Sequence, residues 1–246
     1  MFKNKTAIVT GASSGIGLET ARLLAQKGAS VLAVARRQER LKELSAESKN
    51  ITPVVLDVTG DLSVLDSFLK ERKIDILVNN AGGALGKEPI TEAPKQKWDT
   101  MIDTNVKALI AMTQNVLPSL LKNGGGDIVN LGSIAAYEYY GGGAQYAATK
   151  AAVRALTEAW RHDLIGKNIR VMGIHPGMVD TEFSLVRFGG DQKMADKVYQ
   201  GMTPLTGKDI AEAIVWMLSC PRHVNVQSVV IMPTEQANVW NVHRDS

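Results

Sequence analysis

The chain has 246 residues, of which 45% are hydrophobic and 22% are charged, a composition typical of a folded protein with one substantial core. Its 28 basic and 25 acidic side chains leave a net charge of +3 without a run of like charge, so we expect no nucleic-acid partner. One cysteine excludes an internal disulfide and a cysteine-cluster metal site, and no apolar run approaches the roughly 18 residues of a membrane span, which together predict a cytoplasmic protein with no membrane association.

Short apolar segments rich in β-branched residues alternate with longer segments of helical periodicity. The apolar segments span residues 6–10, 30–35, 52–57, 74–79, 126–132, 169–175 and, more weakly, 224–232. Because they are continuously apolar, both faces of their sheet should be covered. The pattern predicts one α/β domain over residues 1–246, a Rossmann-like doubly wound parallel sheet of about seven strands with helices on both faces. The segment 177–206 follows the sixth strand and looks irregular, so we expect a mobile loop that binds substrate.

A glycine-rich turn, TGASSGIG, follows the first predicted strand and leads into a helix that begins near Ile16. Gly11, Gly15 and Gly17 allow a tight turn, and backbone N–H groups at the start of the helix can then approach a pyrophosphate. Such a turn can also connect a strand to a helix without binding anything. Its position directly after the first strand favours a dinucleotide site.

The G-x-x-x-G-x-G spacing resembles that of the short-chain dehydrogenase/reductase family, and further family motifs follow in the same order. They are NNAG at 79–82, Asn105 in the following helix, Ser133 after the fifth strand, Tyr146 and Lys150 as Y-x-x-x-K, and Pro176-Gly177 after the sixth strand. Each motif alone is common, but their combination in this order is hard to obtain by chance. The resemblance implies a dinucleotide-binding oxidoreductase.

The end of the second strand indicates which coenzyme is used. An NAD enzyme places a carboxylate there for the ribose hydroxyls, whereas an NADP enzyme needs arginine for the 2′-phosphate. Ala35 occupies the carboxylate position, and Arg36 and Arg37 follow it, so we predict NADP with Arg36 as first contact and Arg37 as second. The alternative is that both are solvated arginines at a helix start. Many NADP-dependent members also have a basic residue where this chain has Ser14, so we expect a strong rather than an absolute preference.

The resemblance implies further coenzyme contacts. Asp57 would accept from the adenine amino group beside Val58, although it could instead cap a helix near Leu62, a role for which Asp61 is better placed. Asn79 would support the fold. The complete predicted coenzyme set is Gly11, Ser13, Ser14, Gly15, Ile16, Gly17, Arg36, Arg37, Asp57, Val58, Asn80, Ala81, Gly82, Tyr146, Lys150, Pro176, Gly177, Val179 and Thr181.

Tyr146 and Lys150 are four residues apart, which places them on one face of a predicted helix. A phenol titrates at about 10, but a nearby ammonium and an oxidised nicotinamide would favour phenolate, so Tyr146 could accept a proton from an alcohol. By resemblance, Ser133 would hold the substrate oxygen, and Lys150 would bind the nicotinamide ribose. Asn105 would hold a water that links Lys150 to solvent. The alternatives are a strand-end hydroxyl at Ser133 that bonds backbone and an Asn105 that bonds at a helix kink.

Tyr137, Tyr139 and Tyr140 lie in a glycine-rich loop just before Tyr146. None of the three has a lysine four residues later, so none shares the motif of Tyr146. Aromatic rings in such a loop can form a wall of a substrate pocket or pack on a neighbour. We expect one of the three to line the pocket.

The segments HPGMVDTEFSLVRFGGD (175–191), GGALGKEP and NVHRDS resemble the NADP-dependent 3-hydroxy acid dehydrogenases of the family. This implies a small hydroxy acid substrate: serine, L-allo-threonine, 3-hydroxyisobutyrate, or 3-hydroxypropionate with malonic semialdehyde. Arg187 is the candidate partner for the carboxylate, although a solvated or inter-subunit Arg187 remains open, and Gln145 is a second polar candidate. The predicted substrate set is Ser133, Gln145, Tyr146, Met178, Phe183 and Arg187, with Thr181 beside it.

Two other functions remain open: a short-chain reductase of bulkier ketones or 3-oxoacyl thioesters, and a non-catalytic NADP sensor, which the intact Tyr146 and Lys150 disfavour. The resemblance implies a homotetramer whose C-terminal tail reaches a neighbour. An apolar stripe on the long helices could be interface or core; it consists of Met112, Ala155, Leu156 and Trp160. We expect Cys220 and His175 to be structural and, since His223 and His243 lack partners at ligand spacing, no metal.

Overall fold

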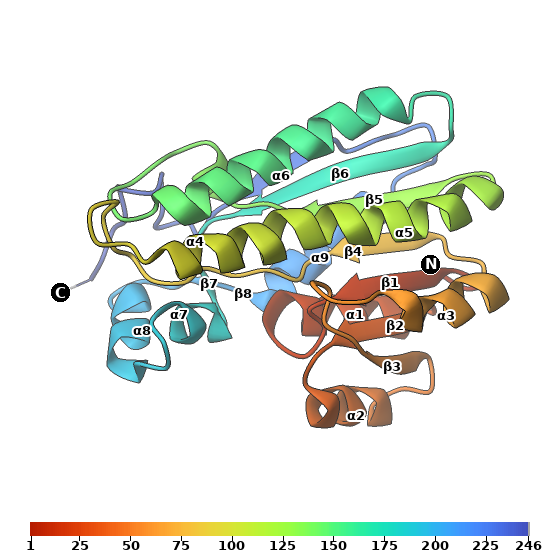
Figure 1. Ribbon diagram of the computed structural model, residues 1–246, viewed down its shortest axis with the longest axis horizontal. Coiled ribbons are helices and arrows are strands. Elements are labelled where there is room, and N and C mark those ends of the chain that lie inside the picture. The colour runs from red at the N-terminus through yellow and green to blue at the C-terminus, as the bar shows by residue number, and fades with distance from the viewer. Residues whose placement is uncertain (246) are drawn as a thin grey trace.

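The computed structural model describes residues 1–245 and contains a seven-stranded parallel sheet (Figure 1). The strands lie in the order β3-β2-β1-β4-β5-β6-β9. Their bounds are β1 Thr6–Thr10, β2 Ser30–Ala35, β3 Ile51–Val55, β4 Ile76–Asn79, β5 Gly126–Leu131, β6 Ile169–Pro176 and β9 Ser228–Ile231. The predicted doubly wound sheet is confirmed, although its last strand is shorter than expected. The strand order reverses between β1 and β4, which is where ligands bind in such sheets.

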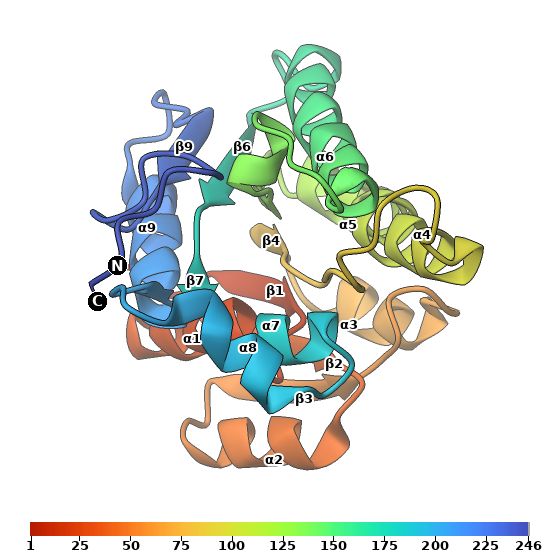
Figure 2. The same ribbon diagram turned by 90° about the vertical axis from the view of Figure 1, so that its left-hand side faces the viewer.

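Helices cover both faces of the sheet (Figures 1 and 2). One face carries α1 Gly15–Gln26, α2 Gln38–Ala46 and α9 Gly207–Ser219. The other carries α3 Asp66–Glu71, α5 Ala108–Lys122 and α6 Ala144–Asp163, with α4 Lys95–Ile102 leading into α5 through a π-helical segment, Asp103–Lys107. Side chains alternate between the faces, as a pleated strand requires: Val9 and Val31 belong to the first core, and Ile8 and Leu32 to the second.

The segment after β6 is folded, not irregular as the sequence had suggested. It consists of β7 Val179–Asp180, α7 Glu182–Arg187, α8 Gln192–Tyr199 and β8 Leu205–Thr206. Thr181 caps α7 by accepting from Phe183 N at 3.2 Å, and Asp191 caps α8 by accepting from Met194 N at 3.0 Å. These capping residues were the sequence signal for two short helices. That the segment moves stays a prediction.

Several smaller expectations can be compared with the structure. Met112 is fully buried in the core, whereas Ala155 on α6 is exposed. The apolar stripe therefore includes both core and surface positions. Cys220, which was expected to be structural, follows α9 and is half-buried. The C-terminal tail bonds to its own chain: Arg244 Nη2 donates to Val198 O at 2.8 Å, and Asp245 N to Gly201 O at 2.7 Å. The tetramer and the tail's contact with a neighbour stay predictions.

Residues 1–245 contain neither a membrane-spanning helix nor a metal-binding cluster of side chains. No helix in this range combines the length and apolar character needed to cross a bilayer. Within the same residues, His, Cys, Asp and Glu side chains form no group of three or more that could hold a metal ion.

Candidate functional site

A cavity of about 760 Å³ lies at the carboxyl ends of the strands, beside α7 and α8, which stand in front of the sheet in Figure 2. Most of the predicted site residues line it. They are Gly11, Ser13, Ser14, Gly15, Ile16, Arg36, Arg37, Asp57, Val58, Asn80, Ala81, Gly82, Ser133, Tyr146, Lys150, Pro176, Gly177, Met178, Val179, Thr181, Phe183 and Arg187. Gly17, Asn105 and Gln145 are not among the lining residues.

The glycine-rich turn is built for close approach of backbone. Gly11 and Gly15 have φ angles of +68° and +53°, which a residue with a side chain rarely adopts. A Cβ at Gly17 would overlap the carbonyl of Gly11, so Gly17 serves packing behind the cavity surface. Ser14, at the start of α1, makes no side-chain cap, which leaves the first N–H groups of α1 available to an anion. This cradle fits the pyrophosphate of a dinucleotide.

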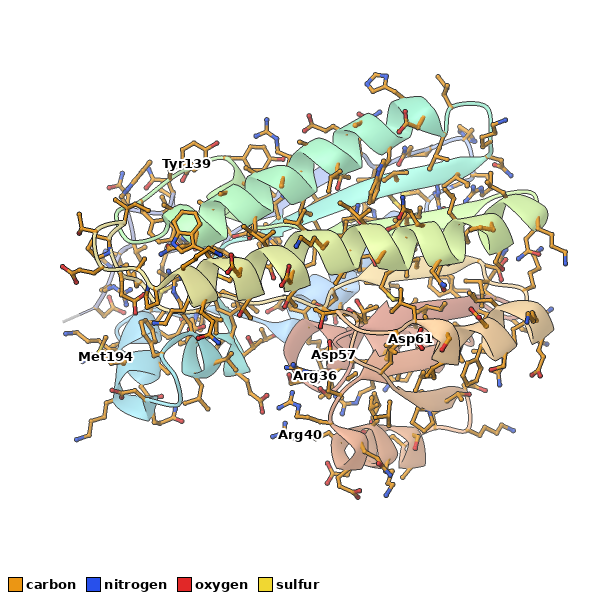
Figure 3. All side chains as sticks on the ribbon, in the orientation of Figure 1. Arg36, Arg40, Asp57, Asp61, Tyr139 and Met194 are labelled. Carbon is orange, nitrogen blue, oxygen red and sulfur yellow. The ribbon has the colours of Figure 1, made fainter. Side chains whose placement is uncertain are left out.

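Three arginines follow β2 beside this turn. Arg37 donates from Nε to Ser13 Oγ at 3.0 Å and from Nη2 to Ser14 Oγ at 2.6 Å. Arg36 is 78% exposed, and its nearest charged partner is Asp57 at 3.6 Å (Figure 3). Arg40, which was not among the predicted site residues, pairs with Glu182 at 2.7 Å. Of the three guanidinium groups, that of Arg36 is the most exposed and has the longest ion pair, so it is the best able to bind a phosphate.

Asp57 does not cap a helix. Its Oδ1 accepts from Thr59 N at 3.0 Å and from Thr59 Oγ1 at 2.7 Å, and these bonds, with a smaller effect of Arg36, hold the pKa of Asp57 below its usual range. Asp61 instead accepts from Ser63 N at 2.9 Å. Asp61 thus makes the contact near Leu62 that was considered for either carboxylate, and Asp57 lies in the cavity wall, where its bond to the adenine amino group stays a prediction.

Ser133, Tyr146 and Lys150 meet at the other side of the cavity. Ser133 follows β5 and begins a 3₁₀ turn, Ile134–Ala136, in which its Oγ accepts from Ala135 N at 3.1 Å. Lys150 Nζ lies 5.8 Å from the centroid of the Tyr146 ring and donates to Leu131 O at 2.7 Å. The i, i+4 spacing on α6 thus brings phenol and ammonium to one face, as predicted.

Asn105 lies behind the cavity, in the π-helical segment before α5. Its Nδ2 donates to Thr149 Oγ1 at 2.9 Å and to Gly83 O at 2.8 Å, and its Oδ1 accepts from Gly83 N at 2.8 Å. These bonds tie the irregular part of the helix to α6 and to the loop after β4, which is the alternative role considered from the sequence. The role in holding a water stays a prediction.

Burial opposes the ionisation of Tyr146 that the ammonium of Lys150 and an oxidised nicotinamide were expected to favour, and the effect of the nicotinamide stays a prediction. Burial of the ring raises the pKa to about 12, and this outweighs the hydrogen bond with Ser133 and the charge of Arg187, which both lower it. Burial also lowers the pKa of Lys150 to about 8, because the ammonium loses its hydration. Tyr146 is therefore a protonated phenol at neutral pH and is ready to donate.

The tyrosines of the preceding loop occupy different environments. Tyr140 lines the cavity, whereas Tyr139 is exposed on the surface (Figure 3). Tyr137 packs edge-on against His175 at 5.0 Å and bonds Ser228 Oγ at 3.0 Å. Of these three tyrosines, Tyr140 is thus the one that forms part of the pocket wall. Burial lowers the pKa of His175 to about 4, so this imidazole is neutral and packs as a structural residue.

Arg187 lies at the substrate side of the cavity with part of its guanidinium free. Its Nε donates to Gly86 O at 3.0 Å, and its Cζ is 5.6 Å from the centroid of Tyr140. Its Nη2 is buried and has no hydrogen-bond partner among residues 1–245. A buried guanidinium nitrogen without a partner is costly unless an anion arrives, so Arg187 fits a carboxylate. Gln145 is buried and is not among the residues that line the cavity.

Several lining residues were not predicted. Lys87 lies with its Nζ 5.9 Å from the Tyr140 ring centroid, on the loop after β4. Val239 and Trp240 come from the C-terminal segment, which returns to the cavity where Gln236 Oε1 accepts from Met178 N at 2.8 Å. No local pattern marks these residues, because they reach the cavity only through tertiary contacts.

The sheet, the anion cradle and the buried Ser-Tyr-Lys group around one cavity define the class of dinucleotide-dependent oxidoreductases. The chain belongs to the short-chain dehydrogenase family, whose sequence profile, described as "short chain dehydrogenase", matches residues 5–187.

Full-length relatives are also similar. Serine 3-dehydrogenase of Agrobacterium fabrum is 43% identical over 250 residues, covering 98% of this chain and 99% of the relative. NADP-dependent 3-hydroxy acid dehydrogenase YdfG of Escherichia coli K12 is 46% identical over 244 residues, covering 96% and 98%. The solved closed form of serine dehydrogenase complexed with NADP⁺ has a TM-score of 0.92 and 44% identity, covering 98% of this chain and 100% of that one.

Proposed function

We propose that the protein is an NADP-dependent dehydrogenase of small 3-hydroxy acids. The observation that carries this proposal is the presence, in one cavity, of a proton-donating Tyr146 and of Arg187 with a buried, unpartnered guanidinium nitrogen. The relatives named for serine and for 3-hydroxy acids support it. Bulkier ketones and 3-oxoacyl thioesters are the alternative, and neither has a carboxylate close to the reacting carbonyl for the guanidinium of Arg187 to bind.

The residues of the cavity fit NADP. The glycine-rich turn and the start of α1 would hold the pyrophosphate, Arg36 the 2′-phosphate, and Lys150 the nicotinamide ribose. When bound, the nicotinamide supplies or accepts the hydride. The remaining chemistry belongs to side chains of the protein.

Tyr146 and Ser133 would handle the substrate oxygen. During reduction the phenol of Tyr146 gives its proton to the carbonyl oxygen while the Ser133 hydroxyl donates a hydrogen bond to the same atom. In oxidation the proton returns to Tyr146, which requires a phenolate. Because burial raises the pKa of Tyr146 to about 12, the protonated form predominates near neutrality and can donate to a carbonyl oxygen.

The charges of the cavity favour a particular substrate within the predicted set. Lys87 and Arg187 lie at the substrate end, and the lining carboxylates, Asp57 and Glu182, are both paired with arginines at the coenzyme end. An acid anion therefore meets cations, whereas the ammonium of serine meets no carboxylate. We infer that 3-hydroxyisobutyrate and 3-hydroxypropionate are better substrates than serine or L-allo-threonine. A side-by-side comparison of kcat/KM for the four acids tests this order, and a higher value for serine would contradict it.

Arg187→Gln is expected to raise the KM for the hydroxy acid by about 10- to 100-fold, since a hydrogen bond to a charged group contributes about 1.5–3 kcal/mol. The matched control is the methyl ester of the same acid, which has no carboxylate. Steady-state kinetics should show little change for the ester. An equal loss for acid and ester would mean that Arg187 supports the fold of α7 and does not bind the carboxylate.

Arg36→Ala is expected to weaken NADPH binding by about 10-fold or more and NADH binding by less than twofold, because only NADPH carries the 2′-phosphate. Titration of coenzyme fluorescence with the purified protein measures both. Arg22→Ala, which removes a guanidinium paired with Glu19 and Glu47 outside the cavity, is the control and should change neither. Equal weakening of both coenzymes by Arg36→Ala would assign the 2′-phosphate to another residue.

A further inference from the structure

Glu182 joins the substrate segment to the arginines beside the glycine-rich turn. It is the first residue of α7, and its Oε2 accepts from Arg37 Nη1 at 2.7 Å, while its Oε1 lies 2.7 Å from Arg40 Nη1. Arg40 extends from α2 toward the side of the molecule where α7 lies (Figure 3). The carboxylate is half-buried, and although burial favours its protonation, the two arginines hold the pKa of Glu182 below its usual range. An ionised Glu182 thus ties α7 to α2.

The other end of α7 is attached to the loop after β4. Gly86 N donates to Arg187 O at 2.8 Å, and Arg187 Nε donates back to Gly86 O at 3.0 Å. Between the two attachments, the Phe183 ring stands edge-on to Tyr146 with centroids 5.5 Å apart. The placement of α7 therefore sets how Phe183 and Arg187 face the phenol, and the carboxylate of Glu182 secures one of its two ends.

Arg37 connects this attachment with the coenzyme cradle. The same guanidinium bonds Glu182 through Nη1, Ser13 through Nε and Ser14 through Nη2. Arg36 directly precedes Arg37 and lines the same cavity, so a 2′-phosphate taken by Arg36 would lie next to the arginine that Glu182 binds. Two anions near one another repel, and the cost is larger where protein partly excludes water. Glu182 should therefore secure α7 while weakening the hold on the phosphate.

We propose that Glu182 is a positioning residue that fastens α7 over Tyr146 through Arg37 and Arg40 and lowers the affinity for the coenzyme's 2′-phosphate. The substrate half of this proposal rests on the proposed function, because it concerns the KM for a hydroxy acid. The coenzyme half does not rest on the proposed function, because binding of NADPH is measured without a substrate. Its signature is that removal of the charge acts in opposite directions on the two ligands, which loss of a purely structural contact would not do.

Glu182→Gln keeps the shape of the side chain and removes its charge. We expect the KM for the hydroxy acid to rise about fivefold with kcat within twofold, since two partly exposed ion pairs together contribute about 1 kcal/mol. The Kd for NADPH, measured by coenzyme fluorescence without substrate, should fall about threefold, and the Kd for NADH should not change. In the unaltered protein the KM should rise with added salt, and in the variant this rise should be smaller, because only the pairing of the substrate carboxylate with Arg187 remains to be screened.

Two further variants sharpen the test. Glu182→Asp keeps the charge, so NADPH affinity should stay at the original value. Glu39→Gln removes an exposed carboxylate that pairs with Lys42 on α2 at 2.9 Å, and it should leave both ligands unaffected. Weaker binding of both ligands in Glu182→Gln would indicate a structural contact, and no change in either would mean that the pairs contribute nothing. Both results overturn the proposal.

Proteolysis separates failure of this proposal from failure of the proposed function. Trypsin can cleave after Arg187, Lys193 and Lys197 when α7 and α8 detach from the domain. Cleavage there should be faster in Glu182→Gln than in the unaltered protein, whether or not any hydroxy acid is turned over. Equal cleavage rates would contradict the fastening role even if hydroxy acids prove to be substrates.

Discussion

Tyr146→Phe is expected to lower kcat/KM for the hydroxy acid by about 10³-fold, within the range of about 10²–10⁴ that a positioned acid or base contributes. The change deletes one hydroxyl and keeps the ring that packs against Phe183. Ser133 could still bond the substrate oxygen, but no side chain would pass the proton. Initial rates of NADPH formation or consumption measure the loss.

The controls for this variant are coenzyme binding and a neighbouring tyrosine. NADPH should bind Tyr146→Phe with an affinity within about twofold of the original, because Tyr146 is only one residue of the predicted coenzyme set and the glycine-rich turn, Arg36 and Lys150 are unchanged. Tyr139→Phe removes the hydroxyl of an exposed tyrosine from the same loop region and should not change turnover. A Tyr146→Phe variant that retains more than a tenth of the original kcat/KM would show that another group transfers the proton.

The direction of the Tyr146 pKa shift shows what could not be reasoned from the sequence. The spacing of Tyr146 and Lys150 is visible in the sequence, and it led us to expect that the ammonium, together with an oxidised nicotinamide, would favour phenolate. How strongly a ring is buried depends on tertiary packing, here on Phe183 and Tyr140 from other segments. Lys150 is itself buried, and its pKa falls to about 8. Burial thus opposes the charged form of both groups, and its effect on the phenol is larger than that of its neighbours.

The parts of the fold that were predicted are those with local signals. Continuous apolar strands and the glycine-rich turn lie in short stretches, and the helix-capping residues Thr181 and Asp191 were also local, although they were overlooked. The ion pairs of Glu182 could not be predicted from the sequence, for a different reason. Its partner Arg37 lies 145 residues earlier in the chain, and nothing near either residue indicates the pairing. Lys87 and Trp240 reach the cavity in the same non-local way.

A second large effect is expected at the opposite end of the same sheet, where Asp127→Ala should lower the free energy of unfolding by about 3–5 kcal/mol. Asp127 and Arg170 are direct neighbours on β5 and β6. Arg170 donates from Nε and Nη2 to the two oxygens of Asp127, at 2.7 and 3.0 Å, and Arg222 adds a third contact. Side-chain exposures of 5% for Arg170 and 11% for Asp127 mean that the variant would leave a buried guanidinium charge without its anion.

Unfolding in urea measures the change in the free energy of unfolding of Asp127→Ala, and a control variant and a double variant are measured in the same way. The control is Asp99→Ala, which breaks an exposed i, i+4 pair with Lys95 and should cost under about 1 kcal/mol. Asp127→Leu combined with Arg170→Met should recover only part of the loss, since it removes both charges together but leaves without a partner the carbonyl oxygens of Leu218, Cys220 and Val224, to which Arg170 donates. If Asp127→Ala costs no more than the exposed control, the pair is not a significant part of the protein's stability.

The kinetics of the folded Asp127→Ala protein should nonetheless stay close to normal, because of where these residues lie along the strands. Asp127 and Arg170 stand near the starts of β5 and β6, whereas Ser133 and Gly177 follow the ends of the same strands. Parallel strands carry ligand sites at their carboxyl ends, so the opposite ends can be devoted to holding the sheet together. A fall in kcat that matched the fall in stability would show that the two ends are coupled. An unchanged kcat would show that the strands hold Ser133 in place even when their starts are weakened.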